Sequence, residues 1–416
     1  MFLKNLQLKH FKNLKDIELS FLSEDEHQDL RNWTFILGEN GTGKSNILKA
    51  IGLITVGSDA LGELIGQPDD WIKYGESFCE INATLINTAK EERKIHLRIN
   101  RGEDLKSLLS RSFESLEELD AALAHTSRNY FIAGYGANRK LANHERSRSL
   151  KSYFRSHRAN TVATLFHKEA TLRSLEEWAI DLDYTNDEAG LKIIETTLND
   201  FLPEISFDHI NKKEKKLIFK TPDGLIPLDQ LSEGFQNMAT WIGDILYQLT
   251  TVFEDYKNPL KARGVLLIDE LALHLHPKWQ RKLIQLISKV LPNFQIICTT
   301  HSPVTAQQAD EESLFLLKRN KQKNIELLPY NGNPQYMPIS ELLMSDAFGL
   351  ETDESVEVES HKKRYKLLKN KKTRTNKEEE EYTEVTNFLM AQPLDAQNER
   401  EKKQIALLEK LMKNKK

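Results

Sequence analysis

The start of the chain alternates between apolar and polar positions. Two such runs occupy residues 3–11 and 16–21, and Lys12 and Asn13 form a polar interruption between them. Successive side chains of a strand point to opposite faces, so alternation is typical of strands with one buried face. The pattern therefore predicts two antiparallel strands joined by a turn.

Later in the chain, continuous apolar runs alternate with helical patterns. The apolar runs predict buried strands over residues 33–38, 264–270 and 294–301, and a terminal pair of strands over 313–319 and 325–329. The helical patterns cover residues 44–54, 228–249 after a first non-helical turn, and 277–291. Strands that are apolar on both sides are buried on both faces, so we expect a mostly parallel sheet with helices on each side.

The middle and the end of the chain have a different character. Strand patterns over 79–86 and 94–99 mix with amphipathic helical patterns over 116–126 and 172–183. After residue 350 a basic block precedes an acidic one, and residues 398–416 predict a charged helix. We divide the chain into an N-terminal lobe (1–60), a mixed α/β and helical insert (61–225), a C-terminal lobe (226–345) and a charged helical tail (346–416).

Composition narrows the class of protein. The chain has 416 residues, a net charge of −4 and only two cysteines, Cys79 and Cys298, which excludes a disulfide framework. The first residues lack the apolar core of a signal peptide, and no apolar run reaches the ~18 residues of a membrane span. We therefore expect a cytoplasmic protein without a membrane partner.

The glycine-rich turn carries the most specific chemistry. Its residues fit the G-x-x-x-x-G-K-[ST] pattern of a phosphate-binding loop, between an apolar strand and a helix. The expected ATP contacts come from Gly38, Glu39, Asn40, Gly41, Thr42, Gly43, Lys44 and Ser45. Glycines let backbone N–H groups wrap the phosphates, Lys44 reaches the β- and γ-phosphates, and the Ser45 hydroxyl holds Mg²⁺.

Two acidic residues end the strand over 264–270. Asp269 at the end of a buried strand is suited to the Mg²⁺ site, and Glu270 directly after it to polarising the attacking water. Without the phosphate loop, the two carboxylates would equally fit a buried strand that simply ends at solvent. The two motifs together predict an ATPase with Glu270 and Lys44 among its catalytic residues.

Residues 231–236 read Leu-Ser-Glu-Gly-Phe-Gln and precede a helix. Ser232 suits a helix N-cap, and Gly234 permits close approach of backbone to a ligand. The segment resembles the ABC signature, with Glu233 where that family commonly has glycine. The resemblance implies that Ser232 and Gly234 contact ATP on a partner chain, and that His301 is the switch histidine that senses the γ-phosphate.

Three further signals have more than one interpretation. Gln67 lies where a glutamine that binds Mg²⁺ would be expected, but glutamine is also common in loops. His274 and His276, in the segment 271–277, form either a metal pair or part of a loop at a dimer interface. Arg139, in Tyr-Gly-Ala-Asn-Arg, contacts nucleotide or a partner, or fixes the ATPase to its insert.

The order of these motifs resembles the AAA/ABC-type ATPases of the OLD, RecF and SMC-like group. Residues 266–284 and 295–308 are especially similar to the OLD and Septu-type anti-phage ATPases. The resemblance implies an α/β fold: an ABC-type P-loop head with a mostly parallel core and an antiparallel N-terminal β subdomain, plus a helical insert and a charged helical tail. It also implies ATP and Mg²⁺ as ligands and a head-to-tail homodimer, with higher oligomers as a further outcome.

Two absences refine this resemblance. No D-x-D pair follows the ATPase motifs, so we expect no TOPRIM nuclease domain in this chain, and the 188 residues from Lys44 to Ser232 are too few for SMC coiled coils. The main hypothesis is an anti-phage switch that controls a separate nuclease or toxin. The alternative is a RecF-like DNA-repair or DNA-end-binding ATPase, for which residues 362–377 offer a basic stretch that also fits a solvated charged segment. A transporter subunit is the least favoured hypothesis.

Overall fold

The structure is a computed structural model of the whole chain. It describes residues 1–23, 29–87, 90–123, 130–139, 153–202, 204–254, 256, 258–371 and 373–391. Internal contacts group the chain into two compact units, residues 1–348 and 349–416. Among the described helices, none is both long and apolar enough to cross a membrane. The finer division of residues 1–345 stays a prediction.

A four-stranded antiparallel sheet forms one layer of the first unit, as the alternating patterns predict. Its strands are β1 (Phe2–Lys9), β2 (Asp16–Ser20), β4 (Phe78–Ile86) and β5 (Glu92–Asn100), in the order β2-β1-β4-β5. The turn between β1 and β2 contains His10 and Lys12, both with left-handed backbone (φ 52° and 53°). Strands from the middle of the chain thus complete a sheet that the N-terminus begins.

The central sheet has six strands in the order β13-β12-β3-β11-β10-β6. They are β3 (Trp33–Gly38), β6 (Ile132–Tyr135), β10 (Gly264–Ile268), β11 (Phe294–Thr299), β12 (Leu314–Arg319) and β13 (Ile325–Pro329). Every neighbouring pair is parallel except β12 with β13. The expected mostly parallel core and the terminal pair of strands are therefore confirmed, and β6 extends the core at its edge.

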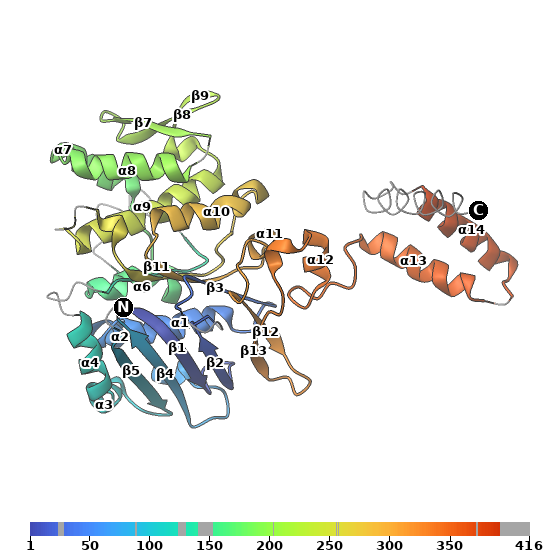
Figure 1. Cartoon of the computed structure of the whole chain (residues 1–416), viewed down its shortest axis with the longest axis horizontal. Helices are drawn as coiled ribbons and strands as arrows, with labels where there is room; N and C mark the ends of the chain where they lie inside the picture. Colours follow the sequence, from blue (N-terminus) through green and yellow to red (C-terminus); the bar gives the residue numbers. More distant parts are fainter. Residues whose placement is uncertain are drawn as a thin grey trace, which may run out of the picture. The chain divides into compact units, whose positions relative to one another are not determined.

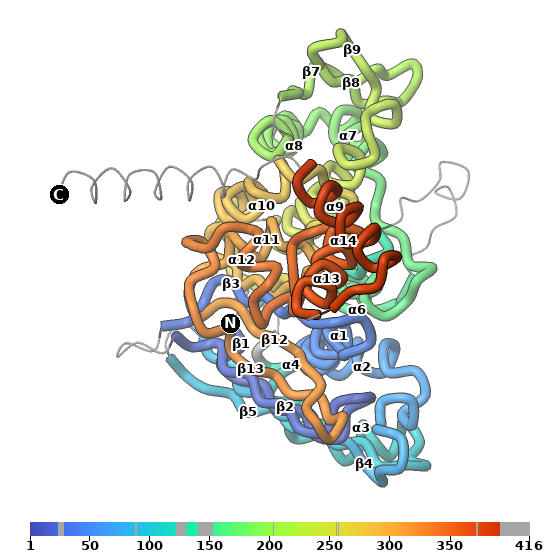
Figure 2. The backbone as a smooth tube through the Cα atoms, turned by 90° about the vertical axis from the view of Figure 1, so that its right-hand side faces the viewer, coloured from blue at the N-terminus to red at the C-terminus, as the bar shows by residue number. Residues whose placement is uncertain are grey.

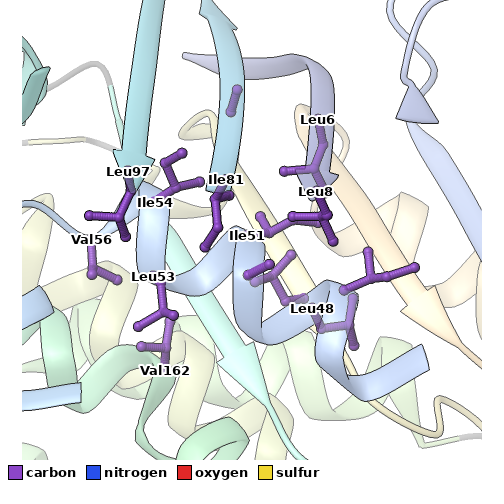
Figure 3. Packing of buried hydrophobic residues seen from close by; sticks show 14 of the residues in the cluster. Leu6, Leu8, Leu48, Ile51, Leu53, Ile54, Val56, Ile81, Leu97 and Val162 are labelled. Carbon is purple, nitrogen blue, oxygen red and sulfur yellow. The ribbon is translucent and has the colours of Figure 1, made fainter. Parts of the chain in front are cut away.

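Helix α1 (Lys44–Thr55) lies between the two sheets and packs its apolar side chains on both (Figure 3). On β10, Val265 and Leu267 face this core, whereas Leu266 and Ile268 face a second core on the other side of the sheet. The helices that cover the second core are α7 (Leu175–Tyr184), α8 (Glu188–Phe201), α9 (Glu233–Val252) and α10 (Pro277–Val290) (Figure 1). Burial on both faces explains the continuous apolar runs of the central strands.

Shorter elements complete the first unit. Beside α1 and the antiparallel sheet lie α2 (Ser58–Leu64), η1 (Pro68–Trp71), α3 (Leu105–Arg111), α4 (Phe113–Leu123) and α6 (His157–Phe166). A three-stranded antiparallel sheet of β7 (Ser206–Asn211), β8 (Lys216–Thr221) and β9 (Gly224–Pro227) lies at the end opposite the larger antiparallel sheet (Figure 2). The remaining elements are η2 (Leu228–Gln230), η3 (Pro259–Lys261), α11 (Pro303–Ala306), η4 (Pro334–Tyr336) and α12 (Ile339–Met344).

Two predicted helices have different bounds in the structure. The helix expected over 172–183 begins at Leu175, because the Ser174 side chain accepts a hydrogen bond from the backbone N–H of Glu177 and caps the helix there. The helix expected over 116–126 is α4, which begins earlier, at Phe113, and its last predicted residues lie outside the described part.

The described part of the second unit contains the helices α13 (Val356–Lys369) and α14 (Asn376–Met390), which pack against each other. Ion pairs and aromatic stacking dominate their contact: Arg364 binds both carboxylate oxygens of Glu381 at 2.5 and 2.6 Å, and the rings of Tyr365 and Tyr382 stack at 5.3 Å. Leu368 and Val385 are the buried hydrophobic residues of the described part of this unit. The charged helix expected over 398–416 lies outside the described residues.

Candidate functional site

The predicted phosphate loop joins β3 to α1 and has the backbone of a nest for anions. Gly41 and Gly43 have left-handed φ angles of 77° and 101°. A Cβ atom at Gly43 would lie 2.7 Å from Asn13 Oδ1 and 2.9 Å from Leu14 Cδ2. Both the conformation and the space therefore require glycine at this position, directly before the positive N-terminal end of α1.

The Lys44 side chain lies along the inner side of this loop. Its Nζ atom donates hydrogen bonds to the carbonyl oxygens of Gly38 at 2.9 Å and Glu39 at 3.2 Å. Burial lowers the pKa of Lys44, while the carboxylates of Glu270 and Asp269 oppose that shift. The two acidic residues at the end of β10 therefore belong to the electrostatic surroundings of Lys44.

The end of β10 is a tight, hydrogen-bonded turn. The Asp269 carboxylate is buried and accepts a hydrogen bond of 2.6 Å from Thr299 Oγ1, which in turn accepts one of 2.8 Å from the backbone N–H of Glu270. Glu270 itself has a left-handed φ of 51°. This conformation costs a non-glycine residue about 1–2 kcal/mol, so the surrounding hydrogen bonds must hold it.

A cavity of about 280 Å³ brings the phosphate loop together with two of the predicted catalytic residues. It is lined by Asn13, Asn40, Gly41, Gly43, Lys44, Ser45, Asn46, Glu270 and His301. His301 Nε2 lies 3.1 Å from Glu270 Oε1. Segments from β3, β10 and β11, far apart in sequence, therefore meet at the carboxyl edge of the central sheet, where α/β proteins commonly bind ligands.

Burial shifts the pKa values of both residues that face the loop. The pKa of Glu270 is raised by burial and by the nearby Asp269 carboxylate, against the lowering influence of Lys44. The pKa of His301 is lowered by burial and by the Lys44 ammonium. His301 is therefore mostly neutral at neutral pH, and its imidazole can either accept or donate a hydrogen bond.

The signature segment lies at the start of α9 and does not line this cavity. Ser232 is the N-cap and is exposed, and Gly234 packs so closely that a Cβ atom there would lie 3.3 Å from the His274 carbonyl oxygen. The rings of Phe235 and Trp279 meet edge to face at 4.2 Å. The N-terminus of α9 and the loop before α10 thus form one exposed surface, apart from the chain's own phosphate loop.

The two histidines of that loop have different surroundings. His276 is the N-cap of α10, and its Nδ1 atom accepts a hydrogen bond of 3.3 Å from the backbone N–H of Lys278. His274 has a left-handed φ of 63° and is exposed. Within the described ranges, no group of three or more histidine, cysteine or acidic side chains is placed to hold a metal ion. A capping role thus accounts for His276.

Gln67 is not brought to the cavity. It is the N-cap residue of η1, its side chain is exposed, and it does not line the cavity. The structure does not place the Gln67 side chain in the cavity that Ser45 lines. Its expected contact with Mg²⁺ stays a prediction.

Sequence reasoning missed several polar residues that support the site. Asn13 Nδ2 donates to the Gly41 carbonyl oxygen at 2.9 Å, and Asn13 Oδ1 accepts from Asn46 Nδ2 at 2.8 Å. Gln280 donates to the Leu275 carbonyl oxygen at 2.7 Å and accepts from Ser302 Oγ at 2.6 Å. The only sequence signal for these residues is their position beside a motif, as with Asn13 in the predicted turn.

The residues at the cavity fit a magnesium nucleotide. The glycine loop and the start of α1 present backbone N–H groups that suit phosphate oxygens, and Lys44 supplies a positive charge. Ser45, which lines the cavity, and the buried Asp269, which does not, both carry the kind of oxygen atom that Mg²⁺ prefers as a ligand. The adjacent Glu270 carboxylate and His301 imidazole are suited to proton transfer and phosphate sensing, so the arrangement supports phosphoryl transfer to water.

The chain is similar to several known proteins. The chain is 25% identical over 351 residues to the "Septu protein PtuA" of Bacillus mycoides, an alignment that covers 84% of this chain and 45% of the relative. It is 24% identical over 363 residues to the "OLD nuclease" of Thermus scotoductus, covering 78% of this chain and 63% of the relative. The "SMC head domain from Thermotoga maritima" superposes with a TM-score of 0.46 and 14% identity, over 80% of this chain and all of that one.

The chain thus spans less than half the length of the Septu relative. The family described as "AAA domain, putative AbiEii toxin, Type IV TA system" matches residues 34–306, which include the phosphate loop, the signature segment, the Asp269–Glu270 turn and His301. The chain therefore belongs to this AAA family and is an ABC-type ATPase of the group that includes OLD and RecF proteins.

Proposed function

We propose that this chain binds ATP with Mg²⁺ in the cavity above the phosphate loop and hydrolyses the γ-phosphate there. The observation that carries the proposal is the convergence of Lys44 and Ser45 with Glu270 and His301 around one cavity. These residues lie in the segments that follow three separate strands of the central sheet, β3, β10 and β11. Their sequence motifs alone would not require them to meet.

In this proposal each residue has one task. The loop N–H groups and Lys44 hold the β- and γ-phosphates and neutralise their charge. Ser45 and Asp269 would hold Mg²⁺, which would supply positive charge to the phosphate oxygens. Glu270 orients the attacking water and accepts its proton, and His301, within 3.1 Å of that carboxylate, donates a hydrogen bond to the γ-phosphate.

We further propose that two chains close head to tail around two ATP molecules. Each chain would supply its phosphate loop to one site and its signature segment to the other. The support is spatial: Ser232 is exposed at the N-terminus of α9, and it lies outside the cavity that contains Lys44. An exposed helix N-terminus is suited to a phosphate brought by a partner chain. In a two-fold symmetric dimer, the same surface of each chain would form the interface, so the two sites would be equivalent.

For the biological role, we propose an anti-phage switch in which ATP hydrolysis controls a separate nuclease or toxin. Similarity over most of this chain to a Septu protein supports this role. The alternative, a RecF-like DNA-binding ATPase, would draw on the basic stretch 362–377. In that stretch Arg364, Lys371 and Arg374 form ion pairs with glutamates of α14, which leaves less positive charge for a phosphate backbone and favours the switch.

The test compares wild type with Lys44→Ala and Glu270→Gln. Lys44→Ala should weaken ATP binding, and Glu270→Gln should keep binding but lower kcat by about 100-fold or more. ATP affinity is measured by calorimetry and hydrolysis by phosphate release. Wild-type hydrolysis by both variants would refute the site. Tagged Glu270→Gln, purified with ATP from its host, would then recover either an effector protein, as the switch predicts, or DNA alone, as the alternative predicts.

A further inference from the structure

Arg139 lies shortly after β6, and Gly136, the first residue after that strand, is held against α6. Gly136 has no room for a side chain, because a Cβ atom there would lie 2.1 Å from the Thr164 carbonyl oxygen. The Gly136 N–H donates to Thr164 Oγ1 at 3.2 Å, and Thr164 Oγ1 donates to the Gly134 carbonyl oxygen at 3.1 Å. The segment that leaves β6 therefore has a fixed starting point beside β10, its neighbour in the sheet.

The Arg139 guanidinium binds the backbone of the catalytic turn. One terminal nitrogen donates to the carbonyl oxygens of Asp269 and Glu270, both at 2.8 Å, and Nε donates to the Gly136 carbonyl oxygen at 3.3 Å. Arg139 does not line the cavity above the phosphate loop. Its hydrogen bonds thus go to the backbone carbonyl groups of Asp269 and Glu270, and its positive charge interacts with the carboxylates of the same two residues.

These hydrogen bonds act on a backbone that needs support. Glu270 adopts a left-handed φ of 51°, and its N–H is already fixed by Thr299 Oγ1. Arg139 fixes the carbonyl oxygen on the other side of the same residue. With both its N–H and its carbonyl oxygen held, Glu270 has its carboxylate directed to His301 and the cavity.

Arg139 also lies against the helix that begins with the signature segment. Its guanidinium is 6.0 Å from the ring centroid of Trp241 on α9. Tyr135, at the end of β6, donates a hydrogen bond of 2.9 Å to the buried Asp244 on the same helix. The half-buried Arg139 therefore contacts α9 as well as the catalytic turn, and it does not line the cavity.

We propose that Arg139 is a positioning residue for ATP hydrolysis, which holds the Asp269–Glu270 turn in its left-handed form and so aims the Glu270 carboxylate at the cavity. The proposal rests on the hydrolytic role assigned to Glu270 above. The sequence left open whether Arg139 contacts nucleotide or a partner, or fixes the ATPase to its insert. The proposal instead assigns Arg139 the support of the catalytic turn. Losing this support should lower kcat more than ATP affinity, because a misplacement of about 1 Å can cost ~100-fold in rate.

The test replaces Arg139 by Lys, which keeps the charge but loses the planar fork, and by Gln, which loses the charge. The matched control is Arg173→Lys: Arg173 also lies on an aromatic ring of α9, 4.4 Å from the Tyr247 centroid, but no hydrogen bond links its side chain to the catalytic turn. Both Arg139 variants should lose about 10- to 100-fold in kcat with ATP affinity within about threefold of wild type. The control should keep the wild-type kcat.

A double-mutant cycle separates positioning from general support of the fold. In a double-mutant cycle, Arg139→Lys should have little further effect in the Glu270→Gln background, because no carboxylate remains to be aimed.

The outcomes are distinct. Wild-type kcat in both Arg139 variants, a loss confined to ATP affinity, or full additivity with Glu270→Gln would each overturn the positioning role. If Arg139→Gln does not fold, Arg139→Lys and its double-mutant cycle decide the question. If Glu270→Gln itself hydrolyses ATP at the wild-type rate, the proposed catalytic site fails and the positioning role fails with it. A dead Glu270→Gln with active Arg139 variants rejects only the positioning role.

Discussion

At the scale of single residues, opposing electrostatic influences act on the Glu270 carboxylate. Burial and Asp269 disfavour its ionised form, and Lys44 and Arg139 favour it. The net effect is a raised pKa, which makes the carboxylate a better proton acceptor. His301, whose pKa is lowered, presents a neutral imidazole beside it.

The first prediction concerns pH. Since the folded-state pKa of Glu270 lies above the ordinary value of 4.5, kcat should begin to fall at a higher pH than for an unperturbed glutamate. Because the pKa of His301 lies below 6.5, its protonation should contribute only on the same acid side. Steady-state kcat between pH ~5 and 8 tests this, with Glu270→Gln as the variant that lacks the carboxylate limb. A flat profile down to pH ~5 would contradict the prediction.

The second prediction concerns the glycine loop. Gly43→Ala should weaken ATP binding by about tenfold or more, because its Cβ would meet Asn13 and Leu14 at a left-handed φ. Gly75→Ala is the matched control, since Gly75 also has a left-handed φ, 86°, but no atom lies within 4 Å of its would-be Cβ. Calorimetric titration with ATP should separate the two variants. Equal affinities would mean that the close approach at Gly43 does not matter for binding.

At the scale of elements, the packing of α13 on α14 differs from that of the central sheet. The strands β3, β10 and β11 are buried along their whole length, apart from the partly exposed Gly38. The two tail helices instead rely on exposed ion pairs and aromatic stacking around two buried aliphatic residues. Exposed ion pairs contribute little stability, so local opening should be frequent in the tail helices.

The third prediction follows from the cap of α14. The Glu378 side chain accepts a hydrogen bond from the Thr375 backbone N–H and pairs with Lys371, which lowers the pKa of Glu378 to about 2. A lowered folded-state pKa stabilises the helix above the ordinary value of 4.5, and this stabilisation is lost as pH falls towards 2. Hydrogen exchange of α14 amides should therefore accelerate as the pH is lowered through this range, after correction for intrinsic rates.

The matched pair for this test is Glu378→Ala and Glu380→Ala. Both remove one glutamate from α14, but only Glu378 belongs to the capping box. Glu378→Ala should speed exchange across α14 and leave β3 and β10 unchanged, whereas Glu380→Ala should have little effect. Equal exchange in the two variants would show that the cap does not stabilise this helix.

At the scale of the whole molecule, the separation of two surfaces is the main feature. The cavity at Lys44 and the exposed start of α9 at Ser232 do not share lining residues. In the head-to-tail dimer that we propose, each site would take its phosphate loop from one chain and its signature segment from the other.

The fourth prediction uses two inactive variants. Lys44→Ala removes the phosphate contact, and Ser232→Arg should block the signature surface by bulk and charge. A mixed head-to-tail dimer would contain one site with both parts intact, so mixing equal amounts should restore up to about a quarter of the wild-type ATPase activity. The control is each variant alone at the same total concentration. Absence of any recovery, with both variants folded, would contradict the shared site.

Much of this architecture follows from local patterns in the sequence. The phosphate loop needs only a short glycine-rich segment between a strand and a helix. The central strands are recognisable because burial on both faces demands continuous apolar runs, and the N-terminal hairpin because one-sided burial demands alternation. Asp269, Glu270 and His301 were predictable because each ends, or directly follows, such a strand.

Other features depend on contacts between segments that are distant in sequence. Asn13 forms its hydrogen bond with Gly41 only because their segments lie side by side in the fold. The same is true of the hydrogen bonds that link Thr299 to Asp269 and Glu270. Gln67 illustrates the reverse, since its position in the sequence suggested a magnesium ligand but its side chain does not line the cavity. Periodicity reports burial of an element and not the identity of its neighbours.

Local sequence patterns were enough to identify an ABC-type ATPase core, because phosphate binding and buried parallel strands both leave local signatures. The contacts of Arg139 are visible only in the folded chain, because its partners are backbone carbonyls of a turn more than a hundred residues away. Backbone carbonyls are present at every residue and leave no mark in the sequence. Their place in space depends on the fold, through the register of β6 beside β10.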